Sequence, residues 1–410
     1  MTSASPDQTS TDFTSTDFTS TDSTSTGPTG PEQPGTDAAA TERFSPLHAA
    51  HVAAGASFTD FAGWQMPVRY SSDLAEHHAV RKAAGLFDLS HMAEIRVSGP
   101  QAGEFLDHAL AGQLSVIDLM QAKYSLLLNS RGGIIDDLVV YRTGETEFLV
   151  VANAGNHDQA LEALTTRSAR FDVTVTDESG DTALIAVQGP NALAIVQATA
   201  GLRVDGDLTG LRYYRALTAG FNGAPVLVAR TGYTGEDGFE LYLPNADALA
   251  LWDALVVAGA PHGLVPAGLA SRDTLRLEAG MPLYGHELTT STYPAQAGLG
   301  RVVNLAKPTD FVGRTASEEG PSGEAHVLVG LVSAGKRAGR AGYEIFRSID
   351  ATEPEGIITS GALSPTLGYP IAMAYVAPPL ARLDTEVFID VRGTRAPATV
   401  IALPFYKRAK

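Results

Sequence analysis

The chain has 410 residues, of which 44% are hydrophobic, and it contains no cysteine. Its 46 acidic residues outnumber its 29 lysines and arginines, and the resulting net charge of −17 argues against binding to nucleic acid or to an anionic membrane surface. The lack of cysteine excludes disulfides, thiolate metal sites and a cysteine nucleophile. No apolar stretch approaches the ~20 residues of a membrane span, so the composition indicates about two or three globular domains in a reduced, cytoplasmic compartment.

Residues 1–44 are predicted to form a disordered acidic tail rich in Ser, Thr and Pro. Residues 1–42 contain no lysine or arginine, and a Thr-Asp-Phe-Thr-Ser pattern repeats within 11–25. Such a segment buries too little apolar surface to offset the entropy of ordering it. It has neither the basic start and apolar run of a signal peptide nor the arginines of a transit peptide. Its role stays open between an inert solvated segment and one that binds a partner.

The first part of the folded chain is predicted to alternate between strands and helices, because its apolar residues switch between periods of two and of about 3.6. In chain order these are a helix at 74–85, a strand at 94–99, a helix at 100–111, strands at 124–129 and 134–141 joined by a turn at 130–133, a strand at 148–153, and a helix at 155–168.

The same order returns after residue 176. A strand at 182–188 is followed by a Gly-Pro break, a helix at 191–200, a hairpin of 226–233 with 239–243, and a helix at 247–258. The repeated order predicts an α+β fold with two similar α/β lobes built on antiparallel sheets, at about 45–175 and 176–324. Short strands at 327–332, 356–359 and 371–376 predict a C-terminal β-barrel domain over 325–410.

Several common sites are missing from the sequence. It has no P-loop, no complete dinucleotide fingerprint, and no HExxH, EF-hand or G-x-S-x-G motif. The histidines lack metal-ligand spacing, since the adjacent His77 and His78 would point roughly 100° apart on a helix. These observations predict neither a metal nor a nucleotide cofactor.

Two acidic positions stand out because they interrupt apolar strands. Asp136 and Asp137 lie among Ile, Leu and Val, and neighbouring strand residues point to opposite faces, so one aspartate is expected to face solvent or a turn and the other an interior. A buried carboxylate needs hydrogen bonds or a charged partner. The residues alone leave open whether the pair serves the turn or a site. Glu240 poses the same problem, with Tyr233 expected across its hairpin.

Arg272 is predicted to open a helix whose Leu275 and Leu277 pack inward, and it is either an ion-pair partner of Asp273 or Glu278 or part of a site. A carboxylate accepts two parallel hydrogen bonds from an aminopyrimidine edge, and arginine grips a carboxylate bidentately. Carboxylate, tyrosine and arginine together therefore suit a planar ring with a carboxylated tail, such as a pterin.

From about residue 45 to 408 the sequence resembles the T-protein family of the glycine cleavage system, which are tetrahydrofolate-dependent aminomethyltransferases. The resemblance is carried by FAGWQMP at 61–67, FDLSHM at 87–92, GGIIDDL at 132–138, RTGYTGEDGFE at 230–240, LRLEAGMPLYG at 275–285, TSGALSPTLG at 359–368 and PFYK at 404–407.

The resemblance implies a fold arranged around a central channel, tetrahydrofolate as co-substrate, and the lipoylated H protein as partner. The aminomethyl group on the lipoyl arm would yield 5,10-methylenetetrahydrofolate, ammonia and dihydrolipoyl H protein. It implies a catalytic role for Asp137 and pterin binding by Glu240. The remaining folate-site positions implied by the family are Tyr124, Tyr233, Arg272 and Tyr406, with Met92 and Asn153 as wall residues.

Such chemistry needs no protein nucleophile, because the reduced ring nitrogens of folate attack the one-carbon unit. Asp137 would either stabilise an iminium-like carbon or manage protons on the folate nitrogens, and we favour electrostatic positioning. The H protein is expected to be acidic, so a local basic surface is needed. Candidates for it, which could equally be ordinary solvated charges, are Lys336, Arg337, Arg340, Lys407, Arg408 and Lys410.

Two rival functions fit parts of the pattern. One is another folate-using member of the broad family, such as a demethylase or the folate domain of sarcosine and dimethylglycine oxidases, which carry an added flavin domain. The other is a non-catalytic folate-binding module in iron–sulfur assembly or RNA modification. That branch relies on a cysteine-containing motif, which this chain lacks.

Overall fold

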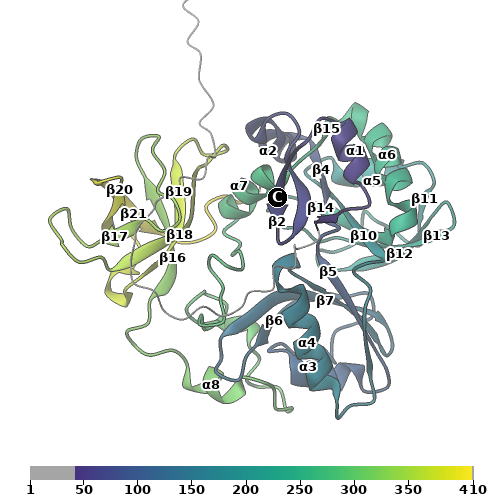
Figure 1. Ribbon diagram of the computed structural model, residues 1–410, viewed down its shortest axis with the longest axis horizontal. Helices are drawn as coiled ribbons and strands as arrows, with labels where there is room; N and C mark the ends of the chain where they lie inside the picture. Colours follow the sequence, from purple (N-terminus) through teal and green to yellow (C-terminus); the bar gives the residue numbers. More distant parts are fainter. Residues whose placement is uncertain (1–41, 409–410) are drawn as a thin grey trace, which may run out of the picture. The chain divides into compact units, whose positions relative to one another are not determined.

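The computed structural model describes residues 42–408, whose helices and strands are shown in Figure 1. The predicted tail lies outside the described residues up to Thr41, and its last two residues, Arg43–Phe44, form strand β1. Strand β1 pairs in parallel with β3 (Trp64–Arg69), which pairs in turn with β2 (Ser57–Phe61). Within residues 42–408 no helix has the length and apolarity to cross a bilayer.

The first large sheet has five strands and carries two helices on one face. Its order is β6-β7-β8-β5-β9. The strands are β5 (Ala93–Ser98), β6 (Ala122–Leu128), β7 (Ile134–Gly144), β8 (Glu147–Ala152) and β9 (Thr174–Asp177), and the helices are α3 (Ala102–Ala109) and α4 (His157–Ser168). Phe105 and Leu106 of α3 pack against Val140 of β7 in a common core, because the helix presents its apolar stripe to the sheet.

The second large sheet has seven strands in the order β11-β12-β13-β14-β10-β4-β15. Its strands are β4 (Ala84–Asp88), β10 (Thr182–Gln188), β11 (Leu202–Val204), β12 (Ala216–Phe221), β13 (Ala224–Ala229), β14 (Gly238–Pro244) and β15 (Leu264–Pro266). The helices near it are α1 (His48–Ala53), α2 (Asp73–Lys82), α5 (Ala192–Ala198) and α6 (Ala248–Gly259).

The sheets do not divide at residue 175, where the sequence placed the lobe boundary. Strand β4 comes from the first half of the chain but pairs with β10, with Ile185 opposite Asp88. The two lobes therefore interleave in sequence. Local patterns predict that a strand exists but not its partner, because pairing depends on contacts between distant segments.

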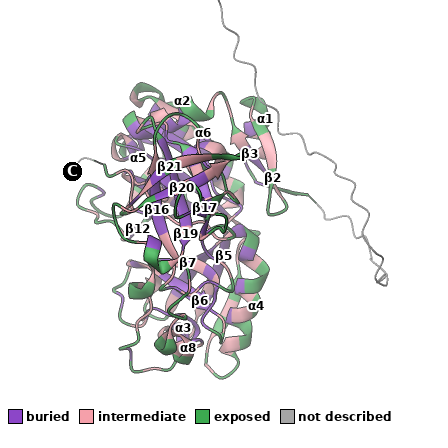
Figure 2. Cartoon of the chain, turned by 90° about the vertical axis from the view of Figure 1, so that its left-hand side faces the viewer, coloured by how far each residue is buried: buried purple, intermediate pink, exposed green. Residues whose placement is uncertain are grey.

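The two large sheets share one apolar layer. One buried cluster contains Tyr141 and Val151 from the first sheet together with Leu184, Ala186 and Tyr242 from the second. Side chains on β7 alternate, so Tyr141 faces this layer while Val140 faces the helices. Figure 2 shows the buried strands inside and the exposed parts of the helices and loops outside.

The C-terminal domain is a closed barrel in the order β16-β19-β18-β17-β20-β21, which confirms the predicted α+β fold with a terminal barrel. Its strands are β16 (Val327–Ser333), β17 (Glu344–Phe346), β18 (Gly356–Leu363), β19 (Pro370–Val376), β20 (Glu386–Val391) and β21 (Thr394–Ile401). Helices α7 (Leu269–Glu278) and α8 (Arg314–Glu319) precede it in the chain, and short 3-10 turns occur at Ala154–Asn156, Asn245–Asp247, Ala260–His262, Gly300–Val302 and Pro378–Leu380.

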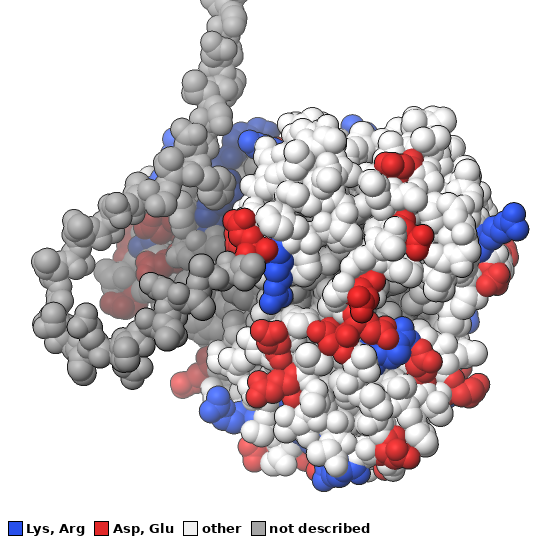
Figure 3. All heavy atoms as spheres, turned by 45° about the vertical axis from the view of Figure 1, so that its right-hand side comes forward, with Lys and Arg blue, Asp and Glu red and all other residues white. Residues whose placement is uncertain are grey.

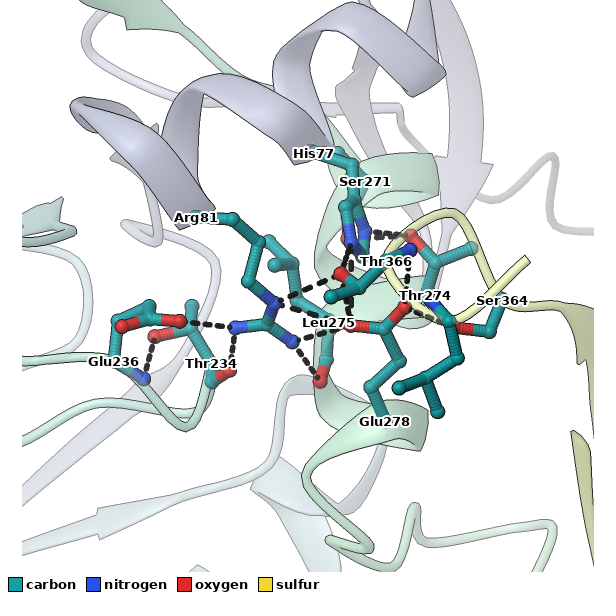
Figure 4. A network of polar contacts seen from close by, with 11 residues as sticks. His77, Arg81, Thr234, Glu236, Ser271, Thr274, Leu275, Glu278, Ser364 and Thr366 are labelled. Atoms are coloured by element: carbon teal, nitrogen blue, oxygen red, sulfur yellow. Dashed lines mark hydrogen bonds and ion pairs between the residues drawn. The ribbon is translucent and has the colours of Figure 1, made fainter. Parts of the chain in front are cut away.

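Buried ion pairs fasten α7 to α2 and to the barrel (Figure 4). Arg81 of α2 donates hydrogen bonds to Glu278 at 2.8 Å, to Glu236 at 3.0 Å and to the carbonyl oxygen of Thr234 at 2.7 Å. Glu278 also accepts from the amide and hydroxyl of Thr366, at 2.9 and 2.7 Å. One guanidinium thus holds together a helix, the loop before β14, α7 and a barrel loop.

We expect Arg81→Met to lower the free energy of unfolding by about 3–5 kcal/mol, because it leaves two buried carboxylates without their cation. Urea unfolding would measure the change. Arg347→Met, which removes the exposed ion pair with Glu355, is the matched control and should move the midpoint little. Equal effects of the two variants would contradict the assigned role of Arg81.

Candidate active site

A cavity of about 490 Å³ is lined by both large sheets, by α7 and by the segment 280–284. All but one of the predicted site residues line it: Met92, Tyr124, Asp137, Asn153, Tyr233, Glu240 and Arg272. They come from β6, β7, β14, α7 and the loops beside β5, β8 and β13, which are far apart in sequence.

Asp137 points into the cavity from β7. Its carboxylate accepts a hydrogen bond from the Tyr124 hydroxyl at 2.9 Å and one from the Asn153 side-chain amide at 2.9 Å. Burial raises the pKa of Asp137 to about 6, although both hydrogen bonds act in the opposite direction. Neutral donors thus hold this carboxylate, and no cation neutralises it within residues 42–408.

The expectation that one aspartate of the pair faces solvent or a turn is wrong. Asp137 faces the cavity, and Asp136 is fully buried on the opposite face of β7. It accepts hydrogen bonds from the backbone amide of Asn153 at 3.0 Å, the Asn153 side chain at 2.8 Å and Asn156 at 2.6 Å. Burial and the charge of Asp137 raise the pKa of Asp136 to about 7. The adjacent carboxylates form one unit bridged by Asn153, while Asn129 makes the turn hydrogen bonds.

Glu240 lies on β14 between alanines of the neighbouring strands, Ala186 and Ala229. One of its oxygens, Oε2, accepts from Thr231 at 2.5 Å and lies 3.5 Å from the hydroxyls of Tyr141 and Tyr242. Burial raises the pKa of Glu240, and these hydroxyls oppose the rise. Its other oxygen accepts no hydrogen bond within residues 42–408, so it stays available to a ligand.

Tyr233 is not across the hairpin from Glu240, because β13 ends at Ala229 and that residue is the one opposite Glu240. Instead the loop after β13 carries Tyr233 into the cavity, where its hydroxyl donates to the carbonyl oxygen of Pro282. The guanidinium of Arg272 lies 4.8 Å from the centre of its ring. This contact joins the loop to α7.

Arg272 pairs with neither Asp273 nor Glu278, the two partners left open by the sequence. Asp273 binds Arg276 at 2.7 Å, and Glu278 binds Arg81. The other cavity arginine, Arg276, is further occupied by Glu287 at 3.0 Å and the barrel hydroxyl of Ser360 at 2.8 Å. Within residues 42–408 the Arg272 guanidinium has no hydrogen bond or ion pair, which leaves its donors for an anionic group.

Tyr406 is the predicted site residue that does not line this cavity. Its ring lies over Arg81, with the guanidinium carbon 4.2 Å from the ring centre, and its backbone amide donates to the carbonyl oxygen of Glu278 at 2.8 Å. The C-terminal segment therefore contacts the ion-pair network shown in Figure 4.

The structure adds residues that the sequence reasoning missed. His91 lines the cavity and packs edge-on against Phe61, with their ring centres 5.3 Å apart. Burial and the charge of Arg272 lower the pKa of His91 to about 4, so its imidazole is neutral near pH 7. Thr231 and Tyr242 also line the cavity. His91 and Thr231 lie within the quoted motifs, but no pattern indicates that their side chains point inward.

A second cavity, of about 450 Å³, lies on the barrel and is strongly basic. It is lined by Lys336, Arg337, Arg340 and Arg392 together with Tyr343 and Thr394. The structure thus adds Arg392 to three of the predicted basic candidates. Arg408 lies elsewhere, 3.6 Å from Asp237, and Lys410 is outside the described residues. No group of three or more His, Asp or Glu side chains suited to a metal ion occurs between residues 42 and 408.

Comparison with known proteins gives consistent matches over the described chain. Residues 47–307 match the family model described as "GCVT N-terminal domain", and residues 326–407 match "Glycine cleavage T-protein C-terminal barrel domain". An aminomethyltransferase of Cutibacterium acnes is 60% identical over 90% of this chain and 100% of its own length, and one of Saccharopolyspora erythraea is 54% identical over 90% and 99%. The crystal structure of glycine cleavage system aminomethyltransferase T from Bartonella henselae has a TM-score of 0.82 and 37% identity, covering 90% of this chain and 99% of that one.

We expect Asp137→Asn to stabilise the fold at pH 7.5 and to lose this advantage toward pH 4. The pKa of Asp137 is raised in the fold to about 6, above the unfolded value of about 3.9, so the folded state binds more protons and stability falls as pH rises through that interval. The uncharged amide removes this penalty. Urea midpoints at both pH values would measure it, with the exposed Asp172→Asn as control. A stability difference between variant and parent that does not grow from pH 4 to pH 7.5 would contradict the expectation.

Proposed function

The chain belongs to the glycine cleavage T-protein family and is an aminomethyltransferase of the glycine cleavage system, and from this premise we propose that tetrahydrofolate binds in the cavity containing Asp137 and Glu240. The observation that carries the proposal is the set of charged groups around one cavity. Two carboxylates there are held only by neutral donors, and one arginine has no protein partner within residues 42–408.

Glu240 supplies the contact for the aminopyrimidine edge of the pterin. A carboxylate has about four acceptor positions, and Thr231 uses one of them. The remaining positions suit two parallel N–H donors, which would offset the desolvation of this half-buried group when the ligand binds. The guanidinium of Arg272, which lies over the ring of Tyr233, provides the cation for the carboxylated tail of folate.

Asp137 acts on the one-carbon unit. The reaction breaks the C–S bond to the lipoyl arm and the C–N bond to ammonia, and it forms two C–N bonds to folate nitrogens. The two folate N–H protons end on the lipoyl thiol and on the released ammonia. When the C–S bond breaks, the carbon becomes iminium-like, and the carboxylate of Asp137, oriented by Tyr124 and Asn153, stabilises that positive charge. Met92 and Asn153 form walls that orient the ring.

A lipoylated H protein would deliver the aminomethyl group. Figure 3 shows one face of the molecule, where acidic side chains gather near the middle, and such a surface would repel an acidic partner. The basic cavity of the barrel offers the opposite charge: Lys336 and Arg340 are held by backbone carbonyl oxygens of Gly368 at 2.9 Å and Gly361 at 3.3 Å. We assign H-protein docking to this cavity, and a cytoplasmic location, where folate and the lipoyl arm are kept reduced, to the enzyme.

We expect Asp137→Asn to lower tetrahydrofolate-dependent turnover about 100-fold or more, the order seen when a preorganised charge is removed from a transition state. Binding of 5-methyltetrahydrofolate, measured by calorimetry, should change little. Because the pKa of Asp137 is about 6, turnover of the parent enzyme should fall as pH drops below that value. Ammonia release from aminomethylated H protein, with and without tetrahydrofolate, gives the turnover and separates this reaction from that of a demethylase. Near-normal turnover of the variant, with Asp172→Asn as control, would remove Asp137 from the mechanism.

For docking, we expect Arg337→Glu combined with Arg392→Glu to reduce the association rate with H protein by about tenfold and to flatten its salt dependence. Stopped-flow mixing at several salt concentrations would measure both. The control is a second double variant, Arg203→Glu combined with Arg212→Glu, which changes the net charge by the same amount at two exposed arginines away from the basic cavity. If both double variants slow association equally, the basic cavity is not the docking site.

A further inference from the structure

A chain of buried hydroxyl groups ends on Glu240. The hydroxyl of Tyr242 donates to that of Tyr141 at 3.2 Å, the hydroxyls of Tyr141 and Thr231 are 3.0 Å apart, and Thr231 donates to Glu240 at 2.5 Å. Tyr141 is 1% exposed and Tyr242 is 5% exposed, so water does not replace these contacts.

The direction of this chain follows from proton accounting. Each hydroxyl has one hydrogen to donate, and an ionised carboxylate only accepts. Since Thr231 donates to Glu240, it accepts from Tyr141, and Tyr141 in turn accepts from Tyr242. Burial and the charge of Glu240 raise the pKa of Tyr141 well above its ordinary range, so Tyr141 keeps the proton that it donates. Hydrogen bonds aligned in one direction polarise and strengthen each other.

Tyr141 also connects the two parts of the site. It lies on β7 of the first sheet, whereas Glu240 and Tyr242 lie on β14 of the second. Asp137 is on the same face of β7, about 13 Å away along the strand at about 3.3 Å per residue. A single strand therefore carries the proposed catalytic carboxylate and the hydroxyl that orients the proposed pterin-binding carboxylate.

We propose that Tyr141 is a positioning residue for folate, which acts through Thr231 to hold the carboxylate of Glu240 in register with Asp137. The inference rests on the folate site proposed above. Tyr141 itself does not line the cavity, so it would act without touching the ligand. The hydroxyl chain occupies one acceptor position on Oε2 of Glu240 and leaves the remaining positions of both oxygens to the pterin.

The chain also favours the ionised form of Glu240, since every donor in it points toward the carboxylate. The charged and titratable groups around Glu240 are Arg272 of α7, Tyr141 of β7, Tyr242 of β14, and Tyr213 and Tyr214 before β12. Of these, Arg272 also favours the ionised form. Loss of the Tyr141 hydroxyl should therefore raise the pKa of Glu240. Folate affinity falls at low pH as Glu240 becomes protonated, and this fall, the acid limb of the binding profile, should move to higher pH.

The test is calorimetric titration of the full chain with 5-methyltetrahydrofolate between pH 5 and 8. Tyr141→Phe should weaken binding about 3–10-fold at pH 7, the effect of one ordinary hydrogen bond, and shift the acid limb upward, while kcat at saturating folate stays near the parent value. Thr231→Val should do the same, and Thr231→Ser should restore binding. Tyr70→Phe, which loses a partly buried hydroxyl contact with His51, is the matched control and should leave binding and its pH profile unchanged.

Glu240→Gln separates this inference from the function on which it rests. If Glu240→Gln weakens binding but Tyr141→Phe and Thr231→Val bind like the parent with the same pH profile, the positioning role is wrong and the folate site stands. If Glu240→Gln binds as tightly as the parent, the folate site is wrong and the inference falls with it. Should Tyr141→Phe fail to fold, the Thr231→Val and Thr231→Ser pair decides.

Discussion

The site depends on three carboxylates, two facing a cavity between the large sheets and one on the opposite face of β7, which within residues 42–408 receive hydrogen bonds only from neutral donors. Asp136, Asp137 and Glu240 accept hydrogen bonds from amides and hydroxyls, and burial raises the pKa of each. Ionised groups in such places are unstable unless something compensates their charge. Here the compensation is incomplete in the free protein, so the site is suited to a ligand that brings N–H donors or develops positive charge.

The arginines near the site differ in whether protein groups already bind their guanidinium groups. Arg81 and Arg276 are saturated by buried carboxylates and carbonyl oxygens, and they fasten α7 to α2, to the loop before β14 and to the barrel. This fastening fixes the helix from which Arg272 projects into the cavity. These ion pairs therefore supply the rigidity that a preorganised site requires, and of the two arginines that line the cavity only Arg272 has no hydrogen bond or ion pair within residues 42–408.

Much of the fold was predictable because many helices and strands follow from the local pattern of apolar and polar residues. The apolar run within 182–188 predicted β10 with the bounds that the structure has, and the short strands after residue 325 predicted the barrel. The pairing of β4 with β10 was not predictable, since it joins segments about a hundred residues apart and no turn links them. For the same reason the lobes interleave where the sequence suggested a single boundary.

The sequence by itself determined which residue types were unusual: acidic groups in apolar strands, an arginine opening an apolar helix, and motifs of one enzyme family. Only the tertiary structure decided how these groups are used. It buried Asp136 on the face of β7 away from the cavity and turned Asp137 into the cavity, left Arg272 rather than Arg276 available, and put Tyr406 on Arg81 instead of in the cavity. The physical reason is that charge compensation and access depend on neighbours brought together by folding, whereas sequence patterns report only which side of its own strand or helix a residue occupies.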